Sequence, residues 1–244
     1  MPRFVWKEED QSHAIAYLPA VGIVLAGLLY ALIRLDAILQ LPVFVMSMLL
    51  LFLPLLVTGG FHLDGYLDVK DALSAYADRK KSLEILKDPH IGAFAVVSFA
   101  KTALLFAGAV YLLTDLARQQ EDRKSLCLFA LLFILSRVGC GITSVLLKSS
   151  KPDGMLQNEV SKNHTPDLIL LILQGVAAFA VMLALSRILA LACATGLFAW
   201  SVFYRYQCER RFGGVSGDTA GYYVVVSELV MVVILAVCSY LLCI

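Results

Sequence analysis

The stretch LILLILQGVAAFAVMLALSRILALACATGLFAWSVFY, from Leu168 to Tyr204, decides the fold class of this chain. It is almost wholly apolar, and Ser186-Arg187 interrupts it near its middle. A helix of about 20 apolar residues crosses the hydrocarbon core of a lipid bilayer. The stretch therefore predicts two membrane-spanning helices, Leu168–Leu185 and Ile188–Tyr204, joined by a tight turn as a helical hairpin.

The composition of the whole chain agrees with a membrane protein. Its 244 residues are 60% hydrophobic and 16% charged, whereas a soluble domain is about half apolar and about a quarter charged. The formal net charge of +1 gives no general attraction to nucleic acid, so no nucleic-acid partner is expected. The six cysteines show no spacing typical of metal ligands. The predicted partner of the surface is the lipid bilayer.

Further apolar runs outside this hairpin bring the predicted number of spans to about seven: Ala14–Ile33, Leu39–Val57, Ile91–Leu113, Leu126–Leu147 and Tyr223–Cys243. No tandem repeat or long linker divides the chain, so residues 1–244 are expected to form a single integral membrane domain. The predicted fold class is all-α, a polytopic transmembrane helical bundle.

Lysine and arginine are distributed unevenly between the two sets of loops. The N-terminal tail and the segments 58–90, 148–167 and 205–222 carry most of them. Because cytoplasmic loops carry an excess of Lys and Arg, these segments are predicted to be cytoplasmic, with the C-terminus on the opposite side. The polar motifs described below then share one face. The longest polar connection, 148–166, is predicted as either a lid over a site or a plain surface loop.

The motif GGFHLDGYLDVKDAL (59–73) contains three aspartates beside apolar spans. In a helix, Asp64, Asp68 and Asp71 fall within about 60° of one another on one face. Carboxylates so close resist ionising together, and a divalent cation removes that conflict. Mg²⁺ uses one or two carboxylates and completes its shell with water and substrate phosphate. The motif predicts a cytoplasmic-side, aspartate-rich helix that binds metal for a phosphorylated substrate; the alternative is a solvated helix face.

Two interpretations are open for each of the other polar residues near these spans. His62 falls on the opposite side of the aspartate stripe, either as an orienting or substrate-contacting group or as a structural histidine. Arg137 lies near the middle of a predicted span, where a charge is costly and usually has a partner. That partner is either a phosphate or a carboxylate such as Asp64 or Asp68, or else Arg137 forms a buried structural ion pair. Glu228 carries the same functional and structural alternatives.

Two further stretches suit phosphate groups. FGGVSGDTAGY (212–222) follows two arginines, and its glycines let backbone N–H groups approach a phosphate closely. It predicts a second wall of a nucleotide site. The segment 77–94 is predicted to form a short amphipathic helix on the membrane surface, with Leu83 and Leu86 toward the apolar side. Its basic residues either hold polyphosphate or only set the orientation of the chain.

GGFHLDGYLDVKDAL, followed by RKKSLEILKDPHIGAFAV and GGVSGDTAG, resembles the cobalamin synthase family, the adenosylcobinamide-GDP ribazoletransferases. The resemblance covers most of the chain. It implies an inner-membrane enzyme that requires Mg²⁺ and joins adenosylcobinamide-GDP to alpha-ribazole, or to alpha-ribazole 5'-phosphate, with release of GMP. It maps the acidic motif onto Asp64, Asp68 and Asp71, and later acidic positions onto Asp88 and Asp218.

The resemblance and the residues together give a provisional assignment of roles. Displacement at phosphorus needs charge neutralisation and in-line positioning. The metal ligands are Asp64, Asp68 and Asp71. Either Asp71 or Asp88 accepts the hydroxyl proton, and His62 is the third catalytic candidate. The candidates for substrate contacts are Lys87, Arg137, Gly213, Gly214, Gly217 and Asp218. Val69 and Lys70 depart from the family pattern, but Lys70 points off the carboxylate stripe.

Two other functions compete with this one. CDP-alcohol phosphotransferases also use an aspartate stripe at a membrane surface, and they would release CMP from a CDP-alcohol. A transporter would place its acidic residues near the middle of the membrane, often within inverted repeats, and no repeat is visible in this chain. The sequence leaves open whether the chain forms a homo-oligomer.

Overall fold

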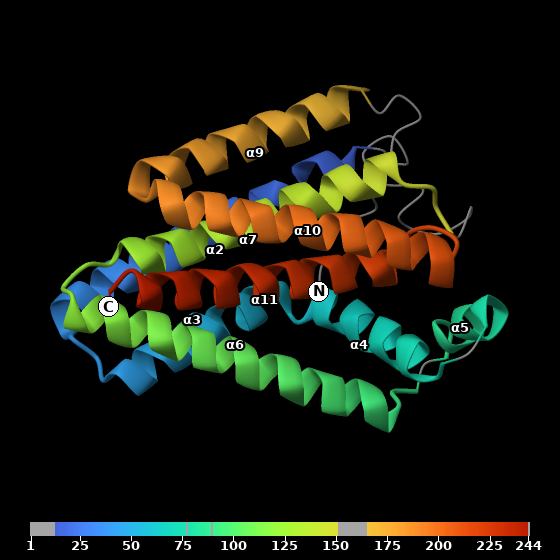
Figure 1. Ribbon diagram of the computed structural model, residues 1–244, viewed down its shortest axis with the longest axis horizontal. Helices are drawn as coiled ribbons and strands as arrows, with labels where there is room; N and C mark the ends of the chain where they lie inside the picture. The colour runs from blue at the N-terminus through green and yellow to red at the C-terminus, as the bar shows by residue number, and fades with distance from the viewer. Residues whose placement is uncertain (1–12, 77, 89, 151–164, 244) are drawn as a thin grey trace, which may run out of the picture.

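The computed structural model describes residues 13–76, 78–88, 90–150 and 165–243. Within these ranges every regular element is a helix (Figure 1), apart from an isolated bridge between Ser149 and Val215. The prediction of an all-α bundle is confirmed. The elements are η1 (Ala14–Tyr17), α2 (Leu18–Leu39), α3 (Val43–Thr58), α4 (Phe61–Ser74), α5 (Arg79–Ile85), α6 (Ala93–Gln119), α7 (Lys124–Leu146), α9 (Thr165–Leu185), α10 (Arg187–Arg211) and α11 (Gly217–Leu241).

Six helices in the described part are long and apolar enough to span a membrane, or seven if one bent pair counts as a span. The predicted hairpin is α9 followed by α10, and the chain breaks between them at Ser186. The Ser186 side chain accepts a hydrogen bond from the Leu189 N–H as the N-cap of α10. The second helix of the hairpin reaches Arg211, well beyond the predicted end at Tyr204.

The second predicted span, Leu39–Val57, is shorter in the structure. Helix α3 begins at Val43 after the N-cap Pro42, and it has 16 residues. It is followed by α4 across a bend of 92°. Gly59 and Gly60 make this bend with φ values of 60° and 77°, which lie in the left-handed region that glycine adopts readily. The glycine pair thus separates α3 from α4 and gives the acidic motif a helix of its own.

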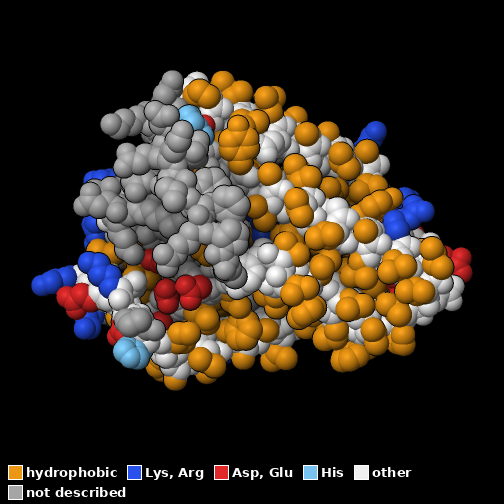
Figure 2. Space-filling model, turned by 180° about the vertical axis from the view of Figure 1, so that it is seen from behind, with side chains coloured by type: hydrophobic (Ala, Val, Ile, Leu, Met, Phe, Trp, Pro, Cys, Tyr) orange, Lys and Arg blue, Asp and Glu red, His pale blue; other side chains and the backbone are white. Residues whose placement is uncertain are grey.

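Helices α7 and α11 form the centre of the bundle (Figure 1). A Cβ atom added to Gly22 of α2 would lie 2.5 Å from the carbonyl oxygen of Phe133 on α7, so the glycine allows these two helices to pack backbone to backbone. Figure 2 shows apolar side chains spread over the middle of the molecule and charged side chains toward its two ends. This distribution suits a bundle surrounded by lipid at its middle.

The polar motifs lie at one end of the bundle. There the Val215 N–H donates to the Lys148 carbonyl over 2.8 Å, and His13 bonds to Asp167 over 2.7 Å. The predicted sharing of one face is confirmed, while its cytoplasmic location stays a prediction. Most of the 148–166 loop lies outside the described residues. The predicted surface helix within 77–94 is confined to α5, and the chain beyond it turns, with the Asp88 N–H donating to the Ile85 carbonyl over 2.9 Å.

Candidate functional site

Helix α4 carries the three predicted metal ligands on one face. Asp64 is exposed, and Asp68 and Asp71 are half-buried. The adjoining face of the helix is buried through Gly65, Tyr66, Val69 and Ala72. The aspartate stripe therefore runs along the edge of the packed face, where side chains reach both the protein and its surroundings.

Helices α4 and α11 approach each other through glycines. A Cβ on Gly65 would lie 2.8 Å from the Cα of Asp218, and a Cβ on Gly221 would lie 2.7 Å from the carbonyl oxygen of His62. Both distances are below van der Waals contact, so larger side chains would push the helices apart. The glycines thus place the first turn of α11, including Asp218, directly against the acidic helix. Two motifs that lie about 150 residues apart in sequence meet here.

The third aspartate of the stripe contacts the start of another helix. A Cβ on Gly92 would overlap the Asp71 carboxylate, so this carboxylate lies against the N-cap residue of α6. The partial positive charge at a helix N-terminus favours a carboxylate there. On the other side of α4, the Lys70 ammonium lies 5.6 Å and 5.4 Å from the ring centres of Tyr66 and Tyr222. Lys70 points off the stripe, as predicted.

The carboxylate groups on α4 are of the chemical type that Mg²⁺ prefers as ligands. Carboxylate oxygens are hard ligands, and Mg²⁺ commonly uses one or two of them together with substrate phosphate. Across the described ranges, no three His, Cys, Asp or Glu side chains converge closely enough to hold a metal ion without other ligands. A site of two carboxylates completed by the substrate is compatible with this arrangement. The metal assignment stays a prediction.

Arg137 forms an ion pair inside the bundle with Glu228 of α11. Its Nη1 lies 2.7 Å from Glu228 Oε1 and also donates to the Phe133 carbonyl over 2.8 Å. Ser136 donates a further hydrogen bond to the same carboxylate oxygen over 2.9 Å. Of the alternatives for Arg137, the structure shows the buried ion pair, and its carboxylate comes from Glu228 of the last helix and not from Asp64 or Asp68. A role of Arg137 in substrate contacts stays a prediction.

His62 borders the same region of the bundle. His62 lines one cavity together with Arg137 and Glu228, whereas the aspartates of α4 do not line it. The expected placement of His62 away from the aspartate stripe is therefore confirmed. Its catalytic role is untested and stays a prediction.

The glycine-rich loop before α11 joins three parts of this end. Gly213 and Gly214 have φ values of 75° and 151°, in the region that favours glycine. Gly213 lies against the guanidinium of Arg79, and Gly214 lies against the backbone of Lys148. Gly217 is exposed and begins α11, with open space around it. The loop is thus fixed against α5 and the end of α7, and its contact with phosphate stays a prediction.

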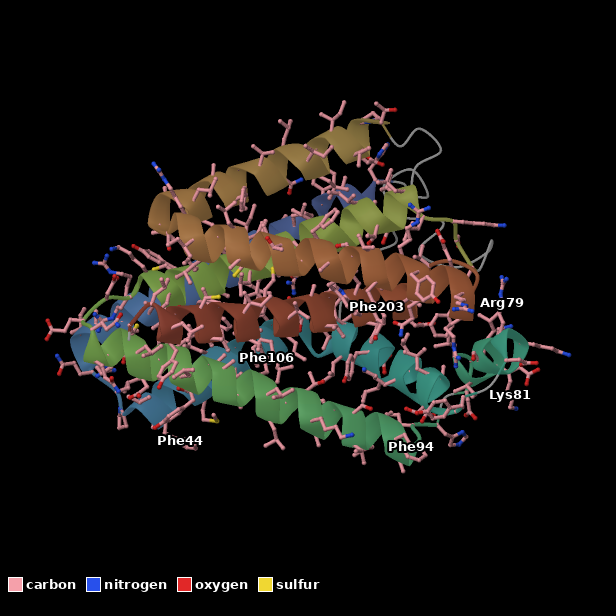
Figure 3. All side chains as sticks on the ribbon, viewed as in Figure 1. Phe44, Arg79, Lys81, Phe94, Phe106 and Phe203 are labelled. Carbon is pink, nitrogen blue, oxygen red and sulfur yellow. The ribbon has the colours of Figure 1, made fainter. Side chains whose placement is uncertain are left out.

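A basic groove of about 600 Å³ lies between the end of α4, α5 and the end of α10. Arg79 and Phe203, which both line it, are labelled in Figure 3. The Arg210 guanidinium lies 5.5 Å from the ring centre of Tyr206. Arginine binds phosphate through a planar fork of donors. We name this cavity the basic groove; its lining residues are Leu73, Tyr76, Asp78, Arg79, Phe203, Tyr206, Gln207, Arg210 and Arg211.

The sequence did not predict that these arginines meet in one groove. Their common side of the membrane was the available signal, and polyphosphate binding by the basic residues of segment 77–94, Arg79 among them, was one of two alternatives. Contacts to the diphosphate were predicted instead at Lys87, Arg137 and the glycine loop. Lys87 is exposed in the connection between α5 and α6, and it lines neither cavity.

Asp88 lies beside Lys87 in the same connection. Its carboxylate accepts hydrogen bonds from the His90 backbone N–H over 3.0 Å and pairs with His90 Nδ1 over 2.7 Å. The backbone hydrogen bond, followed by the side-chain bond, lowers the pKa of Asp88 below its ordinary value. Asp88 is exposed and contributes to neither cavity.

The comparisons with known proteins identify the family of the chain. A family model described as cobalamin-5-phosphate synthase matches residues 1–236. An adenosylcobinamide-GDP ribazoletransferase of Lachnoclostridium phytofermentans is 33% identical over 94% of this chain and 85% of its own length. A protein of the same name from Clostridium perfringens is 30% identical over 97% of this chain and 92% of its own length. No solved structure matches the chain. The chain belongs to the cobalamin-5-phosphate synthase family.

Proposed function

We propose that this protein is an adenosylcobinamide-GDP ribazoletransferase of the bacterial inner membrane, acting at the end of the bundle that carries α4. One observation supports this most: the acidic helix is packed through Gly65 and Gly221 against the first turn of α11. The two motifs on which the family resemblance rests therefore form one site. The excess of Lys and Arg in the segments at this end supports a cytoplasmic location of the site, by the positive-inside rule.

The proposed reaction is a displacement at phosphorus. A hydroxyl oxygen of alpha-ribazole, or of its 5'-phosphate, forms a bond to the phosphorus that carries the cobinamide arm. The bond from that phosphorus to the bridging oxygen breaks, and GMP leaves with the bonding electrons. The hydroxyl proton passes to a carboxylate of the chain. Asp64 and Asp68 would hold Mg²⁺, and the bound ion would neutralise charge on the diphosphate.

Asp71 is the better candidate for accepting the proton. It is half-buried on the same helix face as Asp64 and Asp68, so it faces the same substrate. Asp88 is exposed, and its carboxylate is hydrogen-bonded to His90. A general base has to reach the proton it removes, which favours geometry over pKa as the first criterion.

The basic groove is the proposed site of the GDP group. Arg79, Arg210 and Arg211 give it three guanidinium groups, and Tyr76 and Tyr206 give it aromatic surface. Arginine forks suit a diphosphate, and an exposed aromatic face suits a purine base. The groove begins at Leu73, two residues after Asp71 near the end of α4. We place the phosphates of the bound nucleotide at this end of the groove, nearest the helix that carries the aspartates.

The test measures Mg²⁺-dependent GMP release from adenosylcobinamide-GDP and alpha-ribazole by the full chain in lipid. Asp64→Asn and Asp68→Asn are each expected to lower kcat at least about 100-fold, because each removes a carboxylate that would hold the Mg²⁺ ion, and with it the charge compensation at the reacting phosphorus. Asp115→Asn is the matched control, since Asp115 is half-buried at the other end of the bundle and bonds only to Gln119 within its own helix.

Two further arms of this experiment separate the alternatives. Asp71→Asn is expected to lower kcat about 100-fold or more, and Asp88→Asn to leave it nearly unchanged; the reverse pattern would move the proton acceptor to Asp88. A parallel assay offers a CDP-alcohol and measures CMP. Normal turnover by Asp64→Asn and Asp68→Asn, or CMP release in place of GMP release, would contradict the proposed function.

A further inference from the structure

A second cavity lies deeper in the bundle, beside the bend between α3 and α4. Its volume is about 290 Å³, close to the lower end of the roughly 300–1,000 Å³ found for small-molecule sites. Its walls come from α3, α4, α6, α7 and α11, and most of them are apolar, including Leu51, Phe99, Phe106 and Val224. Phe106 is labelled on α6 in Figure 3. We name this second cavity the bend cavity.

One polar wall of the bend cavity contains Arg137, a residue with an unsatisfied donor. Arg137 and Glu228 line it together with His62. The Arg137 side chain is only 2% exposed, and its Nη1 is used in bonds to Glu228, Ser136 and Phe133. Among the residues that the structure describes, its buried Nε has no hydrogen-bond partner. Leaving a buried N–H without a partner is costly, so a ligand with one acceptor in this position would be favoured.

The chemistry of the walls restricts the ligand. The Arg137–Glu228 pair balances its own charge, so the cavity does not call for an ion. An apolar, flat group with a single acceptor atom satisfies both the apolar walls and the Nε–H. A guanine base carries several donors and acceptors that these walls would leave unpaired, which costs free energy. A corrin ring is far too large for about 290 Å³.

The cavity and the acidic helix share an edge at the bend. Gly60 lines the cavity and is also the residue before α4, and the Asp64 N–H donates to the Gly60 carbonyl over 3.1 Å. Asp64 therefore lies one helical turn from the rim, about 5.4 Å along the axis. Open space surrounds the Cβ position of Gly60. A ligand with its apolar part in the cavity can extend a polar part over Gly60 toward Asp64.

We propose that the bend cavity binds the aromatic base of the ribazole acceptor, with Arg137 donating its Nε–H to the free ring nitrogen. This inference rests on the proposed function. Ribazole joins a dimethylated benzimidazole to ribose, so its base is a flat, apolar bicycle with one acceptor nitrogen. With the base in the cavity, the ribose extends past Gly60 to the aspartate stripe. The acceptor substrate is thereby selected by the membrane-embedded part of the bundle and the donor by the basic groove.

The test fills the cavity from α6. Ala103→Phe places a ring inside it, and Ala100→Phe makes the same change at an exposed position three residues earlier that does not line it. For the full chain in lipid nanodiscs, calorimetry with alpha-ribazole alone is expected to show at least tenfold weaker binding for Ala103→Phe and no change for Ala100→Phe. The KM for adenosylcobinamide-GDP is expected to stay within about twofold in both variants, because the added ring would contact the ribazole base in the bend cavity and not the GDP group in the basic groove.

A second variant addresses the hydrogen bond. Arg137→Lys keeps a positive charge beside Glu228 but removes the Nε–H. It is expected to weaken alpha-ribazole binding and to weaken competition by free benzimidazole by the same factor, because both contain the acceptor nitrogen. Competition by indene, which has the same bicyclic shape without that nitrogen, is expected to be equally weak in wild type and variant.

Three results would overturn the inference: unchanged ribazole affinity in Ala103→Phe, equal changes in the KM of both substrates, or loss from Ala103→Phe of a co-purified phospholipid while ribazole affinity stays normal. The last result would assign the cavity to an acyl chain. Because the binding measurement needs no second substrate, its outcome is independent of GMP release. Failure of the proposed function and failure of this inference are therefore distinguishable.

Discussion

The Arg118–Asp36 pair and the Arg137–Glu228 pair both bury a carboxylate, but they differ in how completely their polar atoms are bonded. Arg118 Nη2 donates to both oxygens of Asp36 over 3.0 Å and to the Leu41 carbonyl over 2.9 Å. The Leu41 N–H donates to the same carboxylate over 3.1 Å. This network closes the turn between α2 and α3 at the end of the bundle away from the acidic helix.

The Arg137–Glu228 pair is less complete and lies against a cavity. Its carboxylate is bonded to Arg137 and Ser136, yet the Arg137 Nε has no partner. In a low-dielectric interior an incomplete polar network is costly, and natural proteins retain such networks mainly where they serve a function. The difference between the two pairs indicates that one fixes the fold and the other leaves a place for a ligand.

Removing the carboxylate of the inner pair is expected to have the largest effect on stability. Glu228→Ala leaves Arg137 charged, 2% exposed and without a counter-ion. The free energy of unfolding is expected to fall by about 3–5 kcal/mol. Equilibrium unfolding in mixed SDS micelles measures this loss. A loss no larger than that of the outer pair would remove the distinction drawn between the two.

Removing the carboxylate of the outer pair is expected to cost less. Arg118 is 30% exposed and can turn toward water in Asp36→Ala, so the loss in unfolding free energy is expected to be about 2 kcal/mol, mostly from the unpaired backbone groups of the turn. GMP release per folded molecule is expected to stay at the wild-type rate. A large fall in kcat for Asp36→Ala would show that this end of the bundle also serves the reaction.

The Asp88–His90 pair is exposed to water. Of the three pairs compared, its disruption is expected to have the smallest effect on stability. His90→Ala removes the side-chain bond, so the pKa of Asp88 is expected to rise toward its ordinary value, as NMR titration of labelled aspartate would show. Because the folded pKa is lowered, the small stabilisation is present above about pH 4 and is lost as pH falls through the folded pKa. Catalysis near neutral pH is expected to be unaffected, and a shifted pH–rate profile would argue for Asp88 as the base.

The sequence predicted the architecture well because hydrophobic length is a strong signal. The hairpin 168–204, the break at Gly59-Gly60 and the shared end of the motifs were all recognisable from composition and loop charge. The spans were less accurate where a helix extends beyond its apolar part, as α10 does, or begins late after a proline, as α3 does.

The site was predicted only in part, because pairing between distant helices is not encoded by local spacing. The stripe on α4 follows from its i, i+4, i+7 pattern. Nothing local indicates that Glu228 meets Arg137, or that Arg79 meets the end of α10, since these contacts depend on how the helices pack. The Gly65–Asp218 contact has the same origin.

The short helix α3 has a consequence for the surrounding lipid. Its 16 residues extend about 24 Å at 1.5 Å per residue, less than the roughly 30 Å of a hydrocarbon core. Such hydrophobic mismatch is relieved by local thinning of the bilayer. The leaflet beside the bend would then be depressed, bringing water nearer to Gly60. The rate of this enzyme is therefore expected to depend on acyl-chain length, with faster turnover in thinner membranes.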